Sequence, residues 1–208
     1  MKYYPAFLDV KNKKAVVVGG GKVSERKVRL LISAGANVTL ISPDITDNLR
    51  TLTEKGLLEH IQRNYKKGDL KDAYIVIAGT SSAATNTKVA QEAGHLVNVI
   101  DIPYEGNYIV PSIVKRGPLT IAISTEGASP AISKAIRKEI EGYYSREFAR
   151  YLRFVEMVRK KAMKKIKNDK KREQFLKSLA SEELLDDLRS KGFSTVQKEI
   201  LSSLDSIK

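Results

Sequence analysis

A run of three glycines at residues 19–21 restricts the fold of this chain more than any other feature. Residues 15–18 before it are a short apolar run, which is typical of a buried parallel strand. A helical pattern follows and is expected to end at Gly35. A strand, a glycine turn and a helix in this order place backbone N–H groups against an anion, usually a pyrophosphate. The positions that recur at helical spacing after the turn are Val23, Lys27, Leu30 and Leu31.

The glycines match a dinucleotide-binding fingerprint only in part. Gly19 and Gly21 supply its first two glycines, and the third position falls on Ser24. A small serine still allows the helix to pack closely against the strand. The alternative is a plain tight turn between strand and helix. The position of the glycines between those two elements favours dinucleotide binding.

Strands and helices alternate through the first half of the chain. After the first strand we expect strands at residues 37–41, 57–63, 74–78 and 96–100, with helices at 46–55 and 83–93. Such alternation predicts an α/β fold with a right-handed, doubly wound parallel sheet. In these sheets ligands bind outside the carboxyl ends of the strands. The tips expected on that rim are Gly19–Val23, Ser42–Asp44, Gly79–Thr80 and Asp101.

The tip of the second strand bears on the choice of cofactor. Ser42 lies at the tip, and Asp44, two residues on, can hold the adenosine ribose of NAD. No arginine stands there to bind a 2′-phosphate, which favours NAD over NADP. Alternatively, Asp44 is an acidic residue that stabilises the start of the next helix.

Asp101 follows the fifth strand and precedes Ile102 and Pro103. A carboxylate at the rim beside a nicotinamide can act as a general acid or base. A turn aspartate that bonds its own backbone before a proline is the alternative. Position alone leaves both roles open.

The pattern changes after residue 106. Residues 107–111, 112–115 and 119–124 are rich in β-forming types without an intervening helix, which predicts an antiparallel addition. Ser129-Pro130 predicts a helix start, with a break at Gly142. Three or four helices are expected beyond it, the last begun by a capping box, Ser194 to Gln197. We therefore expect a sheet domain at 1–113, a small β/α segment at 114–142 and a basic helical domain at 143–208.

The net charge is +13, and residues 114–208 carry +9 of it. A basic half suggests an anionic partner, either nucleic acid or an acidic small molecule, or simply a solvated surface. Aromatic residues do not interleave with the basic run at 159–172, so nucleic-acid binding ranks last and is not expected.

Two absences from the composition exclude whole classes of site. The chain has no cysteine and two histidines, which excludes disulfides and cysteine nucleophiles, and we expect no metal site. No stretch approaches the apolar length of a membrane span. We expect a cytoplasmic protein without a membrane partner.

Several motifs in order resemble the NAD-dependent precorrin-2 dehydrogenases of siroheme synthesis. The resemblance is strong over residues 1–142 and only architectural beyond. The matching segments are Tyr4–Asp9, Val18–Lys27, Asn98–Asp101, Pro111–Leu119 and Ile121–Pro130.

The resemblance implies a Rossmann-like NAD domain, a dimerisation segment, a helical C-terminal domain and a homodimer. It implies oxidation of precorrin-2, an acidic tetrapyrrole, to sirohydrochlorin by hydride transfer to NAD. The family's functional aspartate falls on Asp101, and its NAD contacts fall on Lys22-Val23 and Pro43-Asp44.

Residues near the later motifs are candidates for binding the substrate. Lys115 and Arg116 could attract its carboxylates. Ser124 and Thr125 could line the cleft. Some relatives also insert Fe²⁺ into sirohydrochlorin, and the sequence does not choose between the two kinds. A non-enzymatic NAD-sensing module is a further alternative, but it does not explain residues 98–101 or the β-rich region.

Overall fold

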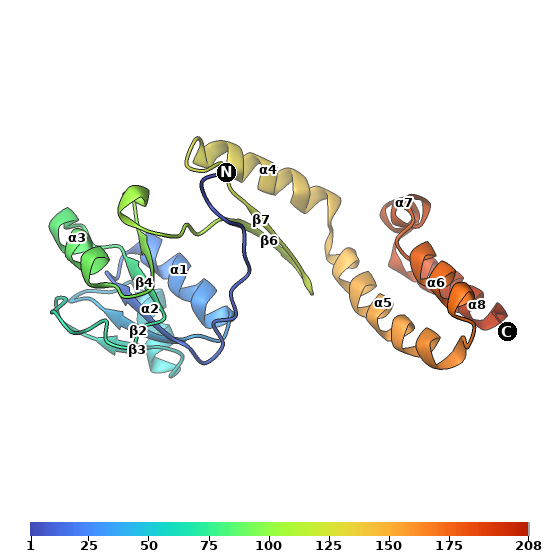
Figure 1. The fold of residues 1–208 in the computed structure, drawn as a ribbon, viewed down its shortest axis with the longest axis horizontal. Helices are drawn as coiled ribbons and strands as arrows, with labels where there is room; N and C mark the ends of the chain where they lie inside the picture. The colour runs from blue at the N-terminus through green and yellow to red at the C-terminus, as the bar shows by residue number, and fades with distance from the viewer. Residues whose placement is uncertain (208) are drawn as a thin grey trace. The chain divides into compact units, whose positions relative to one another are not determined.

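The computed structural model describes residues 1–207 (Figure 1). The chain forms two compact units, an N-terminal unit of Met1–Val110 and a C-terminal unit that begins at Pro111. The expected division at 1–113, 114–142 and 143–208 stays a prediction.

The N-terminal unit is built on a parallel sheet, as predicted. Within the described residues, its strand order is β3-β2-β1-β4-β5. The strands are β1 (Lys14–Val18), β2 (Asn37–Ile41), β3 (Glu59–Ile61), β4 (Ile75–Ala78) and β5 (Leu96–Val99). The helices are α1 (Lys22–Ser33), α2 (Asp47–Glu54), α3 (Ala83–Glu92) and the 3₁₀ turn η1 (Pro103–Glu105). The edge strand β3 is shorter than the expected 57–63, because it pairs with β2 over three positions.

Both faces of the sheet are covered by apolar side chains, as expected for a parallel sheet. In β1, Ala15 and Val17 pack into the core on one face, and Val16 and Val18 pack into the core on the other. The helix α1 contributes Val28 and Leu31 to the first of these cores. It ends before Gly35, as predicted, and Gly35 has a left-handed backbone at φ +81°.

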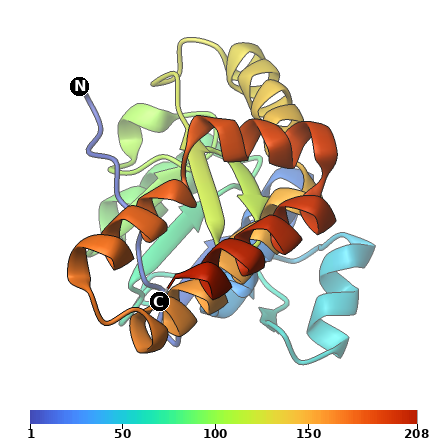
Figure 2. The same cartoon turned by 90° about the vertical axis from the view of Figure 1, so that its right-hand side faces the viewer.

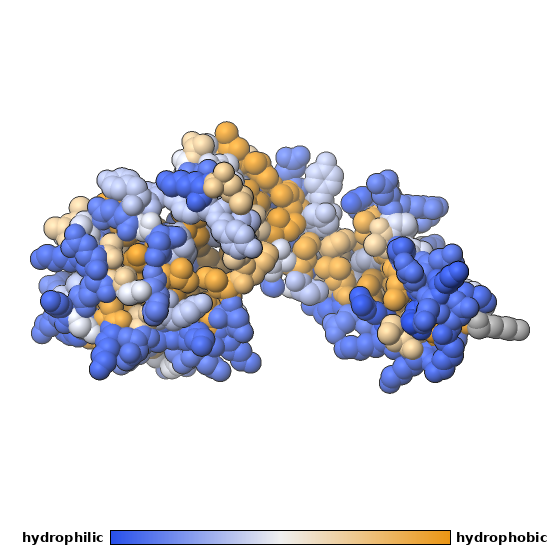
Figure 3. All heavy atoms as spheres, viewed as in Figure 1, coloured by the Kyte–Doolittle hydropathy of each residue, from blue (hydrophilic) through white to orange (hydrophobic). Residues whose placement is uncertain are grey.

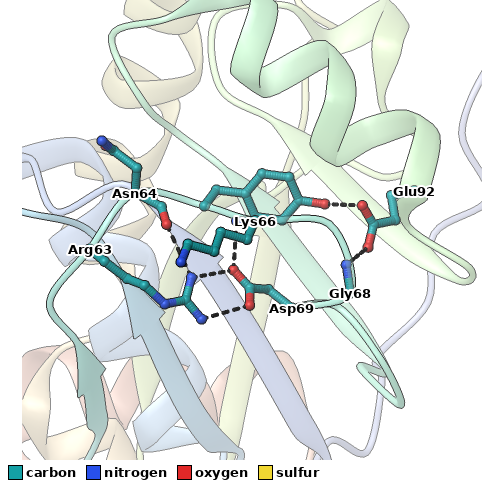
Figure 4. Close-up of polar contacts among 7 residues, drawn as sticks. Arg63, Asn64, Lys66, Gly68, Asp69 and Glu92 are labelled. Carbon is teal, nitrogen blue, oxygen red and sulfur yellow. Dashed lines mark hydrogen bonds and ion pairs between the residues drawn. The ribbon is translucent and has the colours of Figure 1, made fainter.

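The long connection from β3 to β4 is ordered by side chains (Figure 4). The Arg63 guanidinium donates two hydrogen bonds to the Asp69 carboxylate, at 2.7 and 2.8 Å, which lowers the pKa of that carboxyl. The Glu92 carboxylate on α3 accepts from the Gly68 amide and the Tyr65 hydroxyl. These bonds fix a segment that has no regular secondary structure.

The C-terminal unit begins with a hairpin of β6 (Ser112–Arg116) and β7 (Leu119–Ile123), as predicted. The strand expected at 107–111 is wrong. Asn107 bonds to Val97 of β5 through both its backbone and its side chain, with N–O distances of 3.0 and 2.8 Å. One residue therefore occupies the edge of β5, and the following segment does not pair as a strand.

Helices make up the rest of this unit, and those from α5 onward form a bundle (Figure 2). The core of the bundle includes Tyr151, Phe154 and Val158 of α5. In the described part of the chain four helices follow α4, which agrees with the predicted three or four. Within residues 1–207, no helix is long and apolar enough to cross a bilayer. The helices are α4 (Pro130–Tyr143), α5 (Arg146–Lys165), α6 (Asp169–Ser178), α7 (Glu182–Lys191) and α8 (Phe193–Ser206).

Two helix boundaries differ from the prediction. Ser129 caps α4 as expected, but Gly142 does not break it, since a single helical glycine costs only about 1 kcal/mol. The capping box at Ser194 is wrong because Gly192, at φ +80°, both ends α7 and begins α8. Ser194 therefore lies inside the helix.

The backbone after β1 touches the ends of both neighbouring strands. A Cβ atom on Gly19 would lie 2.3 Å from the carbonyl oxygen of Gly79, which follows β4. A Cβ atom on Gly20 would lie 2.2 Å from the carbonyl oxygen of Asp44, which follows β2. These glycines are required by packing within the protein.

We expect Gly20→Ala to lower the free energy of unfolding by about 1–3 kcal/mol, because backbone atoms must move to admit the methyl group. Gly21→Ala is the matched control, since a Cβ atom there meets nothing within 4 Å. Urea unfolding measures both. Equal stability of the two variants would contradict the packing argument.

Candidate functional site

The carboxyl ends of four strands lie at one edge of the sheet, as expected. Val18 pairs with Ile41 and Ala78, and Ala78 pairs with Val99. The loops that follow these strands therefore meet at a common rim. The chain reverses its direction of winding between β1 and β4, which is where such sheets bind ligands.

The N-terminus of α1 is free to bind an anion. Among the described residues, no side chain caps this helix, which begins after Gly21. Space is open around Gly21, and Lys22 and Val23 are exposed in the first turn. The first amides of α1 and the room beside them fit a dinucleotide pyrophosphate. The residues whose side chains cap other helices are Thr46, Ser82, Ser129, Ser145, Asn168 and Ser181.

Ser42 holds the rim after β2 in place. Its hydroxyl donates to the Asp44 carbonyl oxygen at 2.7 Å, and the His60 Nε2 lies 2.9 Å from the Ser42 carbonyl oxygen. Ser42 is buried, so its hydroxyl serves the loop. Pro43 and Asp44 are exposed. The Asp44 carboxylate is therefore the group here that a ribose could reach.

The rim after β4 is fixed by a residue that the sequence did not reveal. The Asn86 amide oxygen on α3 accepts from the Thr80 backbone N–H and hydroxyl, at 3.0 and 2.8 Å, and its NH₂ donates to the Thr80 carbonyl oxygen. The buried Ser24 hydroxyl donates to the Gly79 carbonyl oxygen at 3.3 Å. Ser24 thus allows the close packing of α1 that a small residue at the third fingerprint position is expected to allow.

Asp101 lies at the rim with a left-handed backbone, at φ +65°. Such a conformation is uncommon for a residue other than glycine and occurs often at functional sites. Within residues 1–207, its carboxylate accepts no hydrogen bond, so it does not cap its own turn. The side chain is exposed and available to a ligand.

Lys27 on α1 is a second charged residue near Asp101 that sequence reasoning missed. Burial lowers the pKa of its amine to about 8, Arg26 adds to that decrease, and the Asp101 carboxylate opposes it. The helical spacing of Val23, Lys27 and Leu30 does not explain this burial, because Val23 and Leu30 are exposed. The buried residues of α1 are Ser24, Val28 and Leu31. No signal in the sequence therefore identifies Lys27.

Asn98 is the third residue of β5, inside the motif that ends at Asp101. Its side chain is buried, and its NH₂ donates to the Tyr108 carbonyl oxygen at 3.1 Å. Within the described part of the chain, its amide oxygen has no hydrogen-bond partner. Asn98 therefore anchors the segment that returns from Asp101.

The residues expected to bind substrate belong to the C-terminal unit, whereas the rim belongs to the N-terminal unit. The Lys115 amine donates to the Thr120 hydroxyl at 2.8 Å and is exposed. The Arg116 guanidinium donates to the carbonyl oxygens of Tyr144 and Glu141, at 2.6 and 3.5 Å. Arg116 therefore caps the end of α4.

Ser124 and Thr125 order the loop before α4. The Thr125 hydroxyl donates to the Ser129 carbonyl oxygen at 3.2 Å, and the Ser124 hydroxyl accepts from the Glu126 amide at 3.0 Å. Both hydroxyls have structural partners. Across residues 1–207, no group of three or more His, Asp or Glu side chains gathers as a metal site.

Family models match most of the chain. A model described as putative NAD(P)-binding matches residues 6–112, and one described as sirohaem biosynthesis protein central matches residues 116–143. The chain is 36% identical to the precorrin-2 dehydrogenase of Bacillus subtilis, in an alignment that covers 76% of this chain and 99% of that protein.

The chain is also similar to part of longer proteins. It is 35% identical to the siroheme synthase of Nitrosococcus oceani over 84% of this chain, and 30% identical to siroheme synthase 1 of Aeromonas salmonicida over 98%. It spans 38% and 44% of these two proteins. The solved structure of SirC, precorrin-2 dehydrogenase, has the same fold, with a TM-score of 0.82 over 98% of this chain and 99% of that one at 24% identity.

We expect Gly21→Ala to weaken binding of NADH about tenfold without changing stability, because the new methyl group enters the space beside the α1 amides. Fluorescence titration with NADH and thermal unfolding measure the two quantities. Unchanged affinity would contradict the placement of the dinucleotide at α1.

Proposed function

The chain belongs to the precorrin-2 dehydrogenase and siroheme synthase family, and we propose that it oxidises precorrin-2 to sirohydrochlorin with NAD⁺. The B. subtilis relative, matched over nearly its whole length, supports this activity. The proposed setting is the cytoplasm, where NAD is available.

One arrangement in the N-terminal unit carries the proposal. The uncapped start of α1 and the carboxylate of Asp101 follow strands whose carboxyl ends share one edge. An anion site and a general base on the same rim are what a dinucleotide-dependent oxidation needs. Neither structural alternative, a plain tight turn at the glycines or an aspartate that caps its own turn, would require an anion site and a general base on the same rim.

The proposed reaction removes a hydride and a proton from the substrate. NAD⁺, when bound, accepts the hydride and its electron pair and becomes NADH. The Asp101 carboxylate accepts the proton, so that the tetrapyrrole gains one double bond and the charges balance. The exposed position of Asp101 allows the proton to pass on to water.

We propose NAD rather than NADP on the basis of Asp44. Its exposed carboxylate follows β2, where it can accept hydrogen bonds from the ribose hydroxyls. A 2′-phosphate at the same place would meet a like charge. Lys22 and Val23 at the start of α1, with Pro43 and Thr80 on the neighbouring loops, complete the proposed cofactor contacts.

The proposed substrate is a polycarboxylate, which suits a basic chain. Lys115 is the strongest candidate for attracting it, since its amine is exposed and its one described partner is a neutral hydroxyl. Arg116, Ser124 and Thr125 are proposed to shape the substrate site through the hairpin and the start of α4.

We also propose a homodimer formed through α4. Ile132 is 55% exposed and Ile136 is 36% exposed on one side of this helix, where apolar surface gathers (Figure 3). The described residues of the β6–β7 hairpin pair with no further strand, and a two-stranded sheet is only marginally stable alone. A second copy would cover both features.

Two alternatives make different experimental predictions. A chelatase would also insert Fe²⁺ into sirohydrochlorin, with Asp101 accepting the pyrrole protons. A sensing module would bind NAD without turning over any tetrapyrrole. Incubation with sirohydrochlorin and Fe²⁺, followed by absorbance, separates the first from a dehydrogenase alone.

We expect Asp101→Asn to lower the rate of NADH formation from precorrin-2 by about 10²–10⁴-fold, because the amide cannot accept the proton. Asp72→Asn is the matched control, since Asp72 also has a left-handed backbone, at φ +60°, but precedes β4 at the opposite end of the strand. Absorbance at the NADH band reports both. Wild-type protein without turnover would overturn the proposed function, and an active Asp101→Asn would overturn only the role of this residue.

We expect the double substitution of Ile132 and Ile136 to Glu to dissociate the proposed dimer, because charges would be buried in its apolar interface. Lys134→Glu, on an exposed position of the same helix, is the control. Sedimentation equilibrium gives the mass of each variant. A wild-type monomer would refute the dimer.

A further inference from the structure

Asp101 lies in a short loop whose two ends are held together at β5. The chain leaves the sheet after Ile100, whose backbone N–H donates to the Ala78 carbonyl oxygen at 2.8 Å. It then passes through the 3₁₀ turn η1 and returns to β5 at Gly106 and Asn107. Compact loops whose ends lie close together are often functional, so the contacts that close this one bear on Asp101.

The side chain of Asn107 closes the loop. Its amide oxygen accepts from the Val97 backbone N–H at 2.8 Å, and its NH₂ donates to the His95 carbonyl oxygen at 2.6 Å. The Asn107 backbone N–H also donates to the Val97 carbonyl oxygen, at 3.0 Å. One residue therefore binds both the edge strand β5 and the residue before it, where no further strand of the described sheet pairs.

The residues on either side of Asn107 also contact β5. A Cβ atom on Gly106 would lie 2.8 Å from the Val97 carbonyl oxygen, so the returning backbone lies directly against the strand. On the other side, the buried Asn98 side chain donates to the Tyr108 carbonyl oxygen at 3.1 Å. The closure therefore extends over three consecutive residues and is centred on Asn107.

A contact with α3 holds the far part of the loop. The Glu105 carboxylate accepts a hydrogen bond from the Thr87 hydroxyl at 2.9 Å, and the Glu105 backbone N–H donates to the Ile102 carbonyl oxygen at 3.1 Å. Both β5 and α3 contribute buried side chains to the same core. The loop is thus fixed to two elements that are themselves held by packing.

The backbone of Asp101 needs this support. Its left-handed conformation, at φ +65°, costs free energy for a residue other than glycine and persists only where the surrounding structure imposes it. Within residues 1–207, the Asp101 carboxylate makes no hydrogen bond that could impose it. The closure at β5 and the contact with α3 are the interactions that constrain the loop.

We propose that Asn107 and Thr87 are positioning residues for Asp101, which close its loop and so hold its carboxylate at the rim. The inference rests on the proposed oxidation and deepens it, because it names the residues on which the placement of the general base depends. Such placement matters, since a displacement of about 1 Å can lower a reaction rate about a hundredfold.

The first test needs no catalytic activity. Hydrogen exchange read by mass spectrometry reports how often each backbone segment opens. We expect Asn107→Ala to speed exchange in residues 101–107 about tenfold, because two hydrogen bonds are lost, and to leave the amides of β1 unchanged. Asn64→Ala is the matched control, since Asn64 is exposed and its side chain makes no hydrogen bond among the described residues.

Two outcomes of the exchange experiment would overturn the inference. The first is unchanged exchange in residues 101–107, which would mean that Asn107 does not hold the loop. The second is an equal increase throughout the N-terminal unit, which would mean that Asn107 contributes only to global stability.

The second test separates positioning from cofactor binding. In Asn107→Ala we expect kcat to fall about tenfold while the KM for NAD⁺ stays within about twofold, because the uncapped start of α1 is not part of the loop. In an Asp101→Asn background the same substitution should change kcat less than about twofold, since no general base is left to position. Losses that multiply in the double variant would contradict a role exerted through Asp101.

Thr87→Val decides the inference if Asn107→Ala does not fold. Valine has the shape of threonine but lacks the hydroxyl that binds Glu105. We expect faster exchange in residues 101–107 and a loss of kcat of about two- to fivefold. A variant in which either quantity stays at its wild-type value would overturn the proposal. If the wild type shows no turnover, the proposed function fails, and the exchange experiment still decides whether these residues hold the loop of Asp101.

Discussion

The close approach of backbone to backbone around the β1 tip is the constraint on which the N-terminal unit depends. Gly19 lies against the loop after β4, and Gly20 lies against the loop after β2, without room for a side chain at either. Ser24 adds a hydrogen bond to the same neighbour of β4. Because the loops are locked together, the uncapped amides of α1 are held at a fixed place on the rim. The same backbone contacts therefore pack the loops together and position the candidate binding site.

Local signals in the sequence predicted the elements of the fold well. The glycine turn, the buried strands and the cap at Ser129 depend on neighbouring residues, and the structure has all of them. Prediction failed where tertiary contacts overrode local preference. Asn107 replaces a strand by bonding to β5 with its side chain. The other failure was local, because Gly192 with its left-handed backbone, two residues before Ser194, is the residue at which α8 begins.

The sequence predicted only those residues of the candidate site that follow the ends of strands. Asp44 and Asp101 follow strands, so their place on the rim could be deduced from the order of elements. Asn86 and Lys27 lie within helices. The hydrogen bonds of Asn86 and the partial burial of Lys27 arise only when α3 and α1 pack on the sheet. Their roles come from burial, which a single sequence does not show. The family motifs in the hairpin and at the start of α4 pointed to polar residues there as substrate contacts. In the structure these side chains mostly make hydrogen bonds within their own unit.

The left-handed backbone of Asp101 bears on how this chain could change over generations. Glycine would adopt that conformation without strain, and a hydrocarbon at Lys27 would avoid the cost of a half-buried charge. Selection for stability alone would therefore replace both residues. Where lineages retain them, the retention measures selection for chemistry acting against selection for folding. Asp101 and Lys27 would record that conflict, and the apolar core positions of the sheet would not.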